Sequence, residues 1–219
     1  MRDYLSPERG RAALITIEAQ RDFAMPDSRA KVCGTMAAVP AMRELTRAFR
    51  ARRQPIFHMV RLYRCDGSNV DLCHRASIEE GQRVVMPGTL GAELVDELKP
   101  DPSLRLDAES LLAGQPQPIG EREWILYKPR SSAFYQTPLE EQLRALGVTT
   151  LVVCGCNLPN GPRATVHAGS NRDFRIVLVT DATSGTTDQA LSELAQMGVY
   201  LMTGEQCLAW MARDGKEAA

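Results

Sequence analysis

The chain has 219 residues, of which 44% are hydrophobic and 24% charged, a composition typical of a soluble globular protein with one core and one domain over residues 1–219. The net charge of -1 offers no basic field, so we expect no nucleic-acid partner. No apolar run approaches the ~20 residues of a membrane span and residues 1–10 lack the apolar core of a signal peptide, so we expect a cytoplasmic protein without a membrane partner.

The first half of the chain begins with alternating strand and helix patterns. Residues 12–18 predict a buried strand that ends in Glu18, residues 35–53 a helix and residues 55–60 a second strand. A succession of this length implies a right-handed parallel crossover. Residues 61–120 lack sustained periodicity, apart from short helical turns, and long excursions of this kind are often functional. We expect this segment to form part of a pocket wall.

The second half continues the alternation. The patterns predict strands at residues 123–128, 149–154, 174–180 and 199–202, and helices at residues 137–146, 162–171, 187–197 and 205–213. Strands that alternate with helices form parallel sheets covered on both faces. The predicted fold is therefore a three-layer α/β/α arrangement around a six-stranded parallel sheet.

The stretch at residues 147–169 combines a strand, a loop rich in Gly and Pro, and the start of a helix that Pro162 opens. In open α/β sheets, ligands bind beyond the carboxyl ends of the strands, where helix N-termini offer unpaired N–H groups. We expect the functional site at this loop.

At this loop the sequence resembles the isochorismatase-like, or cysteine-hydrolase, superfamily. Members typically place a catalytic cysteine at the end of a G-x-x-x-N-x-C pattern, and counting from Gly155 that position is Gly161 here. The first strand of the family ends in Asp-x-Gln-x-Asp-Phe, and a lysine follows its third strand. The similar residues here are Glu18, Gln20, Asp22, Phe23 and Lys128. The resemblance spans roughly residues 12–203 and implies the fold predicted above.

The missing cysteine changes the chemistry that the resemblance implies. In members that use the thiol, an aspartate takes its proton, a lysine balances the charge, and the thiolate attacks a carbonyl carbon. Gly161 closes this route, although the neighbouring Cys156 is an alternative thiol. True isochorismatases also carry glycine there and protonate a vinyl ether with the acid of the first strand. By this resemblance Glu18 is a general acid and Lys128 the charge that tunes it.

The change from aspartate to glutamate accompanies the loss of the cysteine. Glutamate is one methylene longer, so its carboxyl group reaches about 1.5 Å further. We expect Glu18 to extend into the volume vacated at Gly161. The alternative for Glu18 is a solvated acid at the end of a strand.

Further polar residues surround this predicted centre. Arg61 and Arg64 follow the second strand and offer bidentate donors to a carboxylate or phosphate, or they pair on the surface with Asp66 or Asp71. The loop amides and N–H groups can bind an oxyanion or substrate carboxylate, or close the loop. The predicted substrate-binding residues are Gln20, Phe23, Arg61, Arg64, Asn157, Asn160 and Arg163.

We predict neither a metal nor another cofactor. Some relatives, the nicotinamidases, bind a metal through Asp-x-His-x-x-His, and neither His58 nor His74 belongs to such a pattern. His58 lies in a predicted strand and is expected to be an interior histidine. Cys65 and Cys73 are not spaced as zinc ligands.

The function predicted from these residues is that of an atypical isochorismatase-like hydrolase. It would act on a small, anionic metabolite by acid/base chemistry at Glu18 and Lys128. One alternative is a catalytically inactive relative that binds a ligand or partner, and another is a laboratory cysteine-to-glycine form of a cysteine amidohydrolase. The loop around Asn157 resembles the amide-cleaving subgroup, so the substrate stays open. The resemblance also implies a homo-oligomer, a dimer or tetramer.

Overall fold

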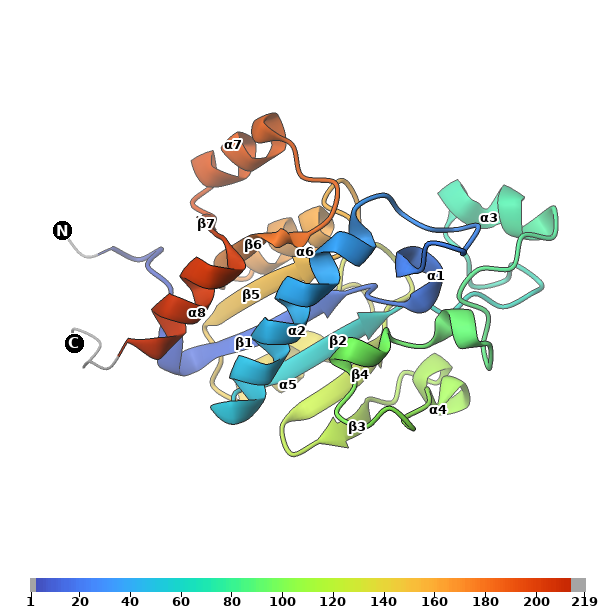
Figure 1. Cartoon of the computed structure of the whole chain (residues 1–219), viewed down its shortest axis with the longest axis horizontal. Helices are drawn as coiled ribbons and strands as arrows, with labels where there is room; N and C mark the ends of the chain where they lie inside the picture. The colour runs from blue at the N-terminus through green and yellow to red at the C-terminus, as the bar shows by residue number, and fades with distance from the viewer. Residues whose placement is uncertain (1–2, 214–219) are drawn as a thin grey trace.

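The computed structural model describes residues 3–213 and contains a central seven-stranded sheet in the order β3-β4-β2-β1-β5-β6-β7 (Figure 1). The strands are β1 (Ala12–Ile17), β2 (Ile56–Val60), β3 (Gln117–Gly120), β4 (Glu123–Tyr127), β5 (Thr150–Gly155), β6 (Arg175–Thr183) and β7 (Tyr200–Met202). Six of them are parallel, as predicted, and β3 pairs antiparallel with β4. The predicted count of six is therefore one too low, because the short edge strand β3 has the Pro and Gly content of a loop.

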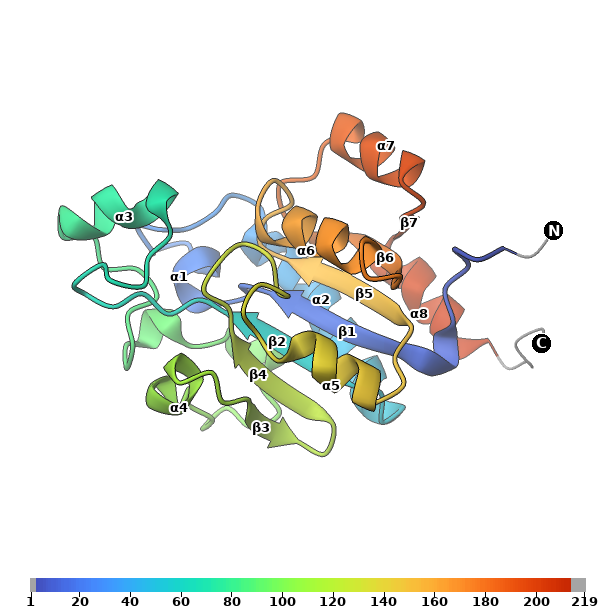
Figure 2. The same ribbon diagram turned by 180° about the vertical axis from the view of Figure 1, so that it is seen from behind.

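Helices cover both faces of this sheet, so the three-layer prediction is confirmed. The helices are α1 (Arg21–Ala24), α2 (Thr35–Ala51), α3 (Leu72–Glu79), α4 (Ala108–Leu112), α5 (Leu139–Ala145), α6 (Gly161–Ser170), α7 (Asp188–Gln196) and α8 (Gly204–Ala212). Figure 1 shows α2 and α8 over one face, and Figure 2 shows α5 and α6 over the other. Along β1, Leu14 packs into the first layer while Ile15 and Ile17 pack into the second. Both faces of β1 are buried, which explains its continuous apolar run.

The excursion between β2 and β4 forms a third cluster of its own. It contains α3, α4, β3 and two single-turn 3-10 helices, Leu90–Ala92 and Asp96–Leu98. Leu62, Ile78 and Leu94 of this segment pack with Ile125 of β4. The helices α1, α3 and α4 were not predicted, because four to eight residues are too few to show a helical period.

The carboxyl ends of β4, β2, β1 and β5 lie side by side, because these four strands are adjacent and parallel. The backbone hydrogen bonds between neighbouring strands extend one residue past the ends of β1, β4 and β5. Glu18 N–H donates to Met59, Lys128 N–H to Val60 and Cys156 N–H to Ile17. The chain thus brings Lys128, Arg61, Glu18 and Cys156 to one edge of the sheet. Within residues 3–213, no helix has the length and apolar character needed to cross a membrane.

Candidate active site

Glu18 lies at the centre of this edge and is almost fully buried. Its backbone has a φ of 50°, a left-handed conformation that is uncommon for a side chain of this size and that turns the chain out of the strand. The carboxylate accepts hydrogen bonds from Lys128 and from Nε of Arg61, the latter at 2.8 Å. Burial opposes its ionisation, but the charges of Lys128 and Arg61 outweigh burial and lower the pKa of Glu18. The resting side chain is therefore a carboxylate rather than the proton donor expected from the sequence.

Lys128 donates a hydrogen bond to the carboxylate of Glu18. Its side chain is fully buried, and Nζ donates to Glu18, to the carbonyl of Arg130 at 3.2 Å and to the carbonyl of Ser131 at 3.1 Å. Burial lowers the pKa of Lys128 to about 8, although Glu18 opposes this effect. The three acceptors use all three N–H groups of the ammonium, so Lys128 acts on a ligand through Glu18.

Arg61 connects Glu18 to a second buried acid. Its guanidinium donates to Asp71 at 3.3 Å and to the carbonyl of Pro129 at 3.0 Å, and the Tyr63 hydroxyl donates to Asp71 at 3.1 Å. Burial opposes ionisation of Asp71, but the hydrogen bond from His74 and the charge of Arg61 lower its pKa. The predicted surface pairing of Arg61 with Asp71 is present, but it is buried and belongs to the site.

A cavity of about 200 Å³ opens in front of Glu18. One side is formed by Glu18, Arg61, Ser131, Cys156, Asn157 and Asn160 from the loops after the strands. The other side comes from Phe23 and from the excursion, including Tyr63, His74, Ile78 and Val84. This volume suits a small metabolite, since pockets for drug-sized ligands begin at about 300 Å³.

Four of the seven predicted substrate-binding residues, Phe23, Arg61, Asn157 and Asn160, line this cavity. The amides of Asn160 and Asn157 also bond to each other at 2.9 Å, so loop closure and cavity lining coexist. Tyr63 and His74, which line the cavity, and Asp71, which bonds to both, were missed as functional residues. The sequence signal for these residues was the run of polar side chains that follows the second strand. Only the fold shows that this run lies at the edge of the sheet where the strands end.

The other three predicted binding residues lie elsewhere. Gln20 is fully buried; its amide donates to the carbonyls of Arg61 and Ala92 and accepts from the Arg61 N–H, so it fixes the backbone of Arg61. Arg64 is exposed and does not line the cavity. Arg163 bonds to Glu193 of α7 at 3.2 Å, because the first turn of α6 directs it away from the cavity.

Gly161, at the start of α6, is buried against β1. A Cβ atom added there would lie 2.6 Å from Cγ2 of Ile17, while its next contact, the carbonyl of Ser131, would be at 3.5 Å. The expectation that Glu18 fills the volume left by the cysteine is therefore wrong. The Cγ2 methyl group of Ile17, the last residue of β1, lies against this position, whereas Glu18 lines the cavity.

Cys156 is the thiol that lies at the cavity, and it is 2% exposed. Burial raises the pKa of Cys156 to about 11. The group is therefore a neutral thiol at physiological pH, and a thiol is a much weaker nucleophile than a thiolate. His58 is an interior histidine, as predicted, and its ring lies between Thr16 at 2.8 Å and Glu123 at 2.7 Å.

Residues 12–206 match the family model described as the isochorismatase domain. The chain belongs to the isochorismatase family. This settles the resemblance drawn from the loop and from the first strand, and it places the protein among hydrolase relatives.

Three proteins similar to this chain carry different names within the family. An isochorismatase family protein from Desulfovibrio vulgaris is 31% identical, with a TM-score of 0.78 over 93% of this chain and 99% of that one. A protein of Arabidopsis thaliana named "probable inactive nicotinamidase" is 31% identical over 81% of this chain and 82% of its own length. Ureidoacrylate amidohydrolase RutB of Methylorubrum extorquens is 31% identical over 63% of this chain, and the match spans about half of that relative, 48%.

Proposed function

We propose that this family member hydrolyses a small, anionic metabolite by non-covalent acid/base chemistry at Glu18 and Lys128. One observation carries the proposal: a carboxylate faces a small cavity while a buried ammonium with a pKa of about 8 holds it. Buried titratable groups whose pKa values are shifted by burial and by a charged partner, and which face a cavity, are typical of acid/base sites. The cation Arg61 at the cavity favours an anionic substrate.

The ionised state of Glu18 sets the order of the proton transfers. Glu18 first accepts a proton from water as the water oxygen bonds to the electrophilic carbon of the substrate. The protonated Glu18 then gives that proton to the leaving group as the old bond breaks. Lys128 stays charged throughout and restores the carboxylate state. Glu18 thus becomes the expected acid only after it has acted as a base.

The test is a pair of substitutions with matched controls. Glu18→Gln and Lys128→Met should each lower turnover by at least about a hundredfold, as the loss of a general acid/base should. A thermal-shift screen of acids, amides and enol ethers supplies the substrate, because a ligand of the folded state raises the melting temperature. Glu141→Gln and Lys31→Met change exposed residues and should leave turnover intact. Full turnover in both site variants would contradict the proposal.

The pH dependence of the reaction gives a second test. Because the pKa of Lys128 is lowered to about 8, its ammonium is present below that pH and is lost as the pH rises through it. Glu18 then loses one of the two cations that keep it ionised and oriented. The kcat/KM of the wild type should therefore fall above about pH 8, and this limb should move to higher pH in Lys128→Arg. A profile that stays flat to pH 10 would show that loss of the Lys128 charge does not limit the reaction in this range.

A second candidate function is ligand binding without turnover. Two observations favour it: a Cβ atom at Gly161, where the family places its cysteine, would overlap Ile17, and one relative carries the name of a probable inactive nicotinamidase. A metabolite that binds tightly and is recovered unchanged at every pH would establish this function. The contact with Ile17 also argues against a laboratory cysteine-to-glycine form, because a cysteine would need that methyl group to move.

A further inference from the structure

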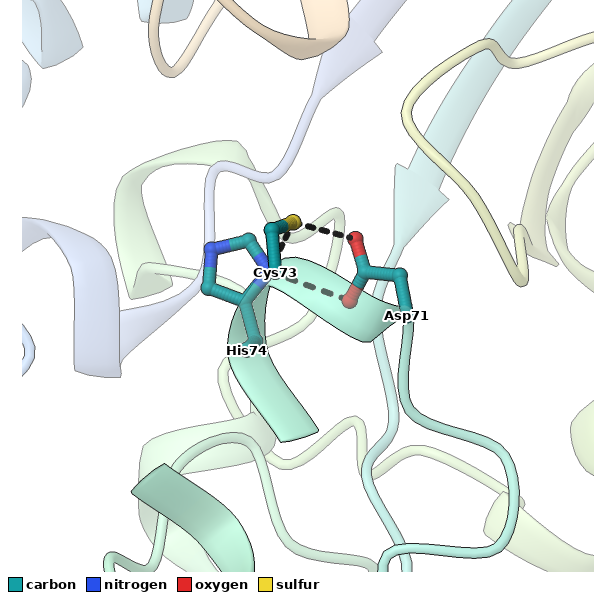
Figure 3. Close-up of side chains that lie close together, drawn as sticks. All are labelled: Asp71, Cys73 and His74. Atoms are coloured by element: carbon teal, nitrogen blue, oxygen red, sulfur yellow. Dashed lines mark hydrogen bonds and ion pairs between the residues drawn. The ribbon is translucent and has the colours of Figure 1, made fainter. Parts of the chain in front are cut away.

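Three side chains at the start of α3 converge outside the proposed acid/base pair. Asp71 precedes the helix, and Cys73 and His74 project from its first turn toward the carboxylate (Figure 3). The thiol lies 3.5 Å from Asp71 Oδ2 and 3.2 Å from His74 Nδ1, and this nitrogen lies 3.0 Å from Asp71 Oδ1. Within residues 3–213 this is the group of carboxylate, thiol and imidazole ligands spaced closely enough to share one ion.

The triangle has nearly the dimensions of a metal site. Zinc binds oxygen and nitrogen at about 2.0 Å and sulfur at about 2.3 Å, so the edges of a tetrahedral site measure roughly 3.3 to 3.6 Å. The three edges here are 3.0, 3.2 and 3.5 Å. An ion would therefore require each pair of ligand atoms to separate by only a few tenths of an ångström.

Hydrogen bonds already link these three groups. The Cys73 thiol donates to Asp71 Oδ2, and a hydrogen on His74 Nδ1 can bond to Asp71 Oδ1. A divalent cation would meet all three ligands at once. Its binding would displace the thiol proton of Cys73 and move the hydrogen of a neutral His74 to Nε2.

The surroundings fix the ligands and leave a way in. The Tyr63 hydroxyl and the Arg61 guanidinium both bond to Asp71, which orients this carboxylate as the outer partners of metal ligands do. Cys73 and His74 are exposed, so an ion can reach them from solvent. His74 also lines the cavity, so the cluster borders the space in front of Glu18.

We propose that Asp71, Cys73 and His74 bind one divalent transition-metal ion of the zinc class at the rim of the cavity. A mixed set of oxygen, sulfur and nitrogen suits Zn²⁺, and three protein ligands leave a fourth position for water or an anion. We predicted no metal from the sequence, because neither His58 nor His74 belongs to the Asp-x-His-x-x-His pattern of the nicotinamidases. This site does not depend on the proposed acid/base chemistry, and either can fail alone.

Cobalt is the probe that reports on the thiol directly. Chelator-treated wild type titrated with Co²⁺ should develop a near-ultraviolet thiolate-to-cobalt charge-transfer band that saturates at one ion per chain. Cys73→Ser should abolish the band, and His74→Ala should weaken Zn²⁺ binding in calorimetry by at least about tenfold. Cys73 and His74 lie on the surface of α3, so both variants should fold normally, which circular dichroism checks.

Matched controls come from the other exposed thiols and imidazole. Cys33→Ser, Cys65→Ser and His167→Ala change exposed residues outside the cluster and should leave the band and the Zn²⁺ affinity unchanged. The proposal is overturned if the wild type shows no band, if the band survives in Cys73→Ser, or if His74→Ala binds Zn²⁺ as tightly as the wild type.

Discussion

At the scale of the residue, Ile17 and Gly161 decide which chemistry the site can host. Gly161→Cys should destabilise the fold by about 1–3 kcal/mol, because Cβ would lie 2.6 Å from a methyl group that is itself fully buried. The added thiol should also produce no amidase activity while Ile17 is present. Denaturant unfolding and an amide substrate panel measure the two effects.

A double-mutant cycle isolates this contact from other costs of the cysteine. Ile17→Ala removes the Cγ2 methyl group, so Gly161→Cys should cost less in that background, with a coupling energy of at least about 0.5 kcal/mol. Additive effects would mean that the overlap is not what opposes a side chain at position 161. The sequence could predict the missing cysteine but not its replacement, since Ile17 looks like any other residue of a buried strand.

At the scale of the element, the buried carboxylate of Glu123 connects three secondary-structure elements, β4, α2 and β2. Glu123 opens β4, accepts two hydrogen bonds from Arg50 of α2 at 2.6 and 2.7 Å, and bonds to His58 of β2. Burial opposes its ionisation, but these bonds lower the pKa of Glu123 to about 2. A carboxylate with a lowered pKa stabilises the fold above its unfolded pKa of about 4.5, and this contribution is lost as the pH falls toward 2.

The stabilisation that Glu123 gives the fold through Arg50 and His58 should therefore weaken in acid. The shift corresponds to roughly 3 kcal/mol of stability at neutral pH, since one pKa unit is about 1.4 kcal/mol. The difference in free energy of unfolding between the wild type and Glu123→Gln should narrow steadily between pH 5 and pH 3 in urea titrations. Glu141→Gln, an exposed change in α5, is the control. A constant difference across this range would show that Glu123 does not act through its charge.

At the scale of the whole molecule, the sequence predicted the repeating parts better than the irregular ones. The six parallel strands were predictable because each is an apolar run between helical segments, and Glu18 and Lys128 were predicted from a family pattern at strand ends. The prediction that the excursion forms part of the pocket wall is confirmed, but the sequence did not show which of its residues line the cavity. Residues such as Tyr63 and Val84 have no periodic pattern, and their position depends on how the excursion folds back over the sheet.

The two borders of the sheet have a consequence for how copies of the chain can meet. One border is β3, four residues long with Pro118, which has no N–H to offer a neighbour, and the other is β7, three residues long. Borders this short and poor in free donors resist the addition of strands from another molecule. We therefore expect copies of this protein to associate through the helical layers and loops, and not through a sheet that runs from one subunit into the next.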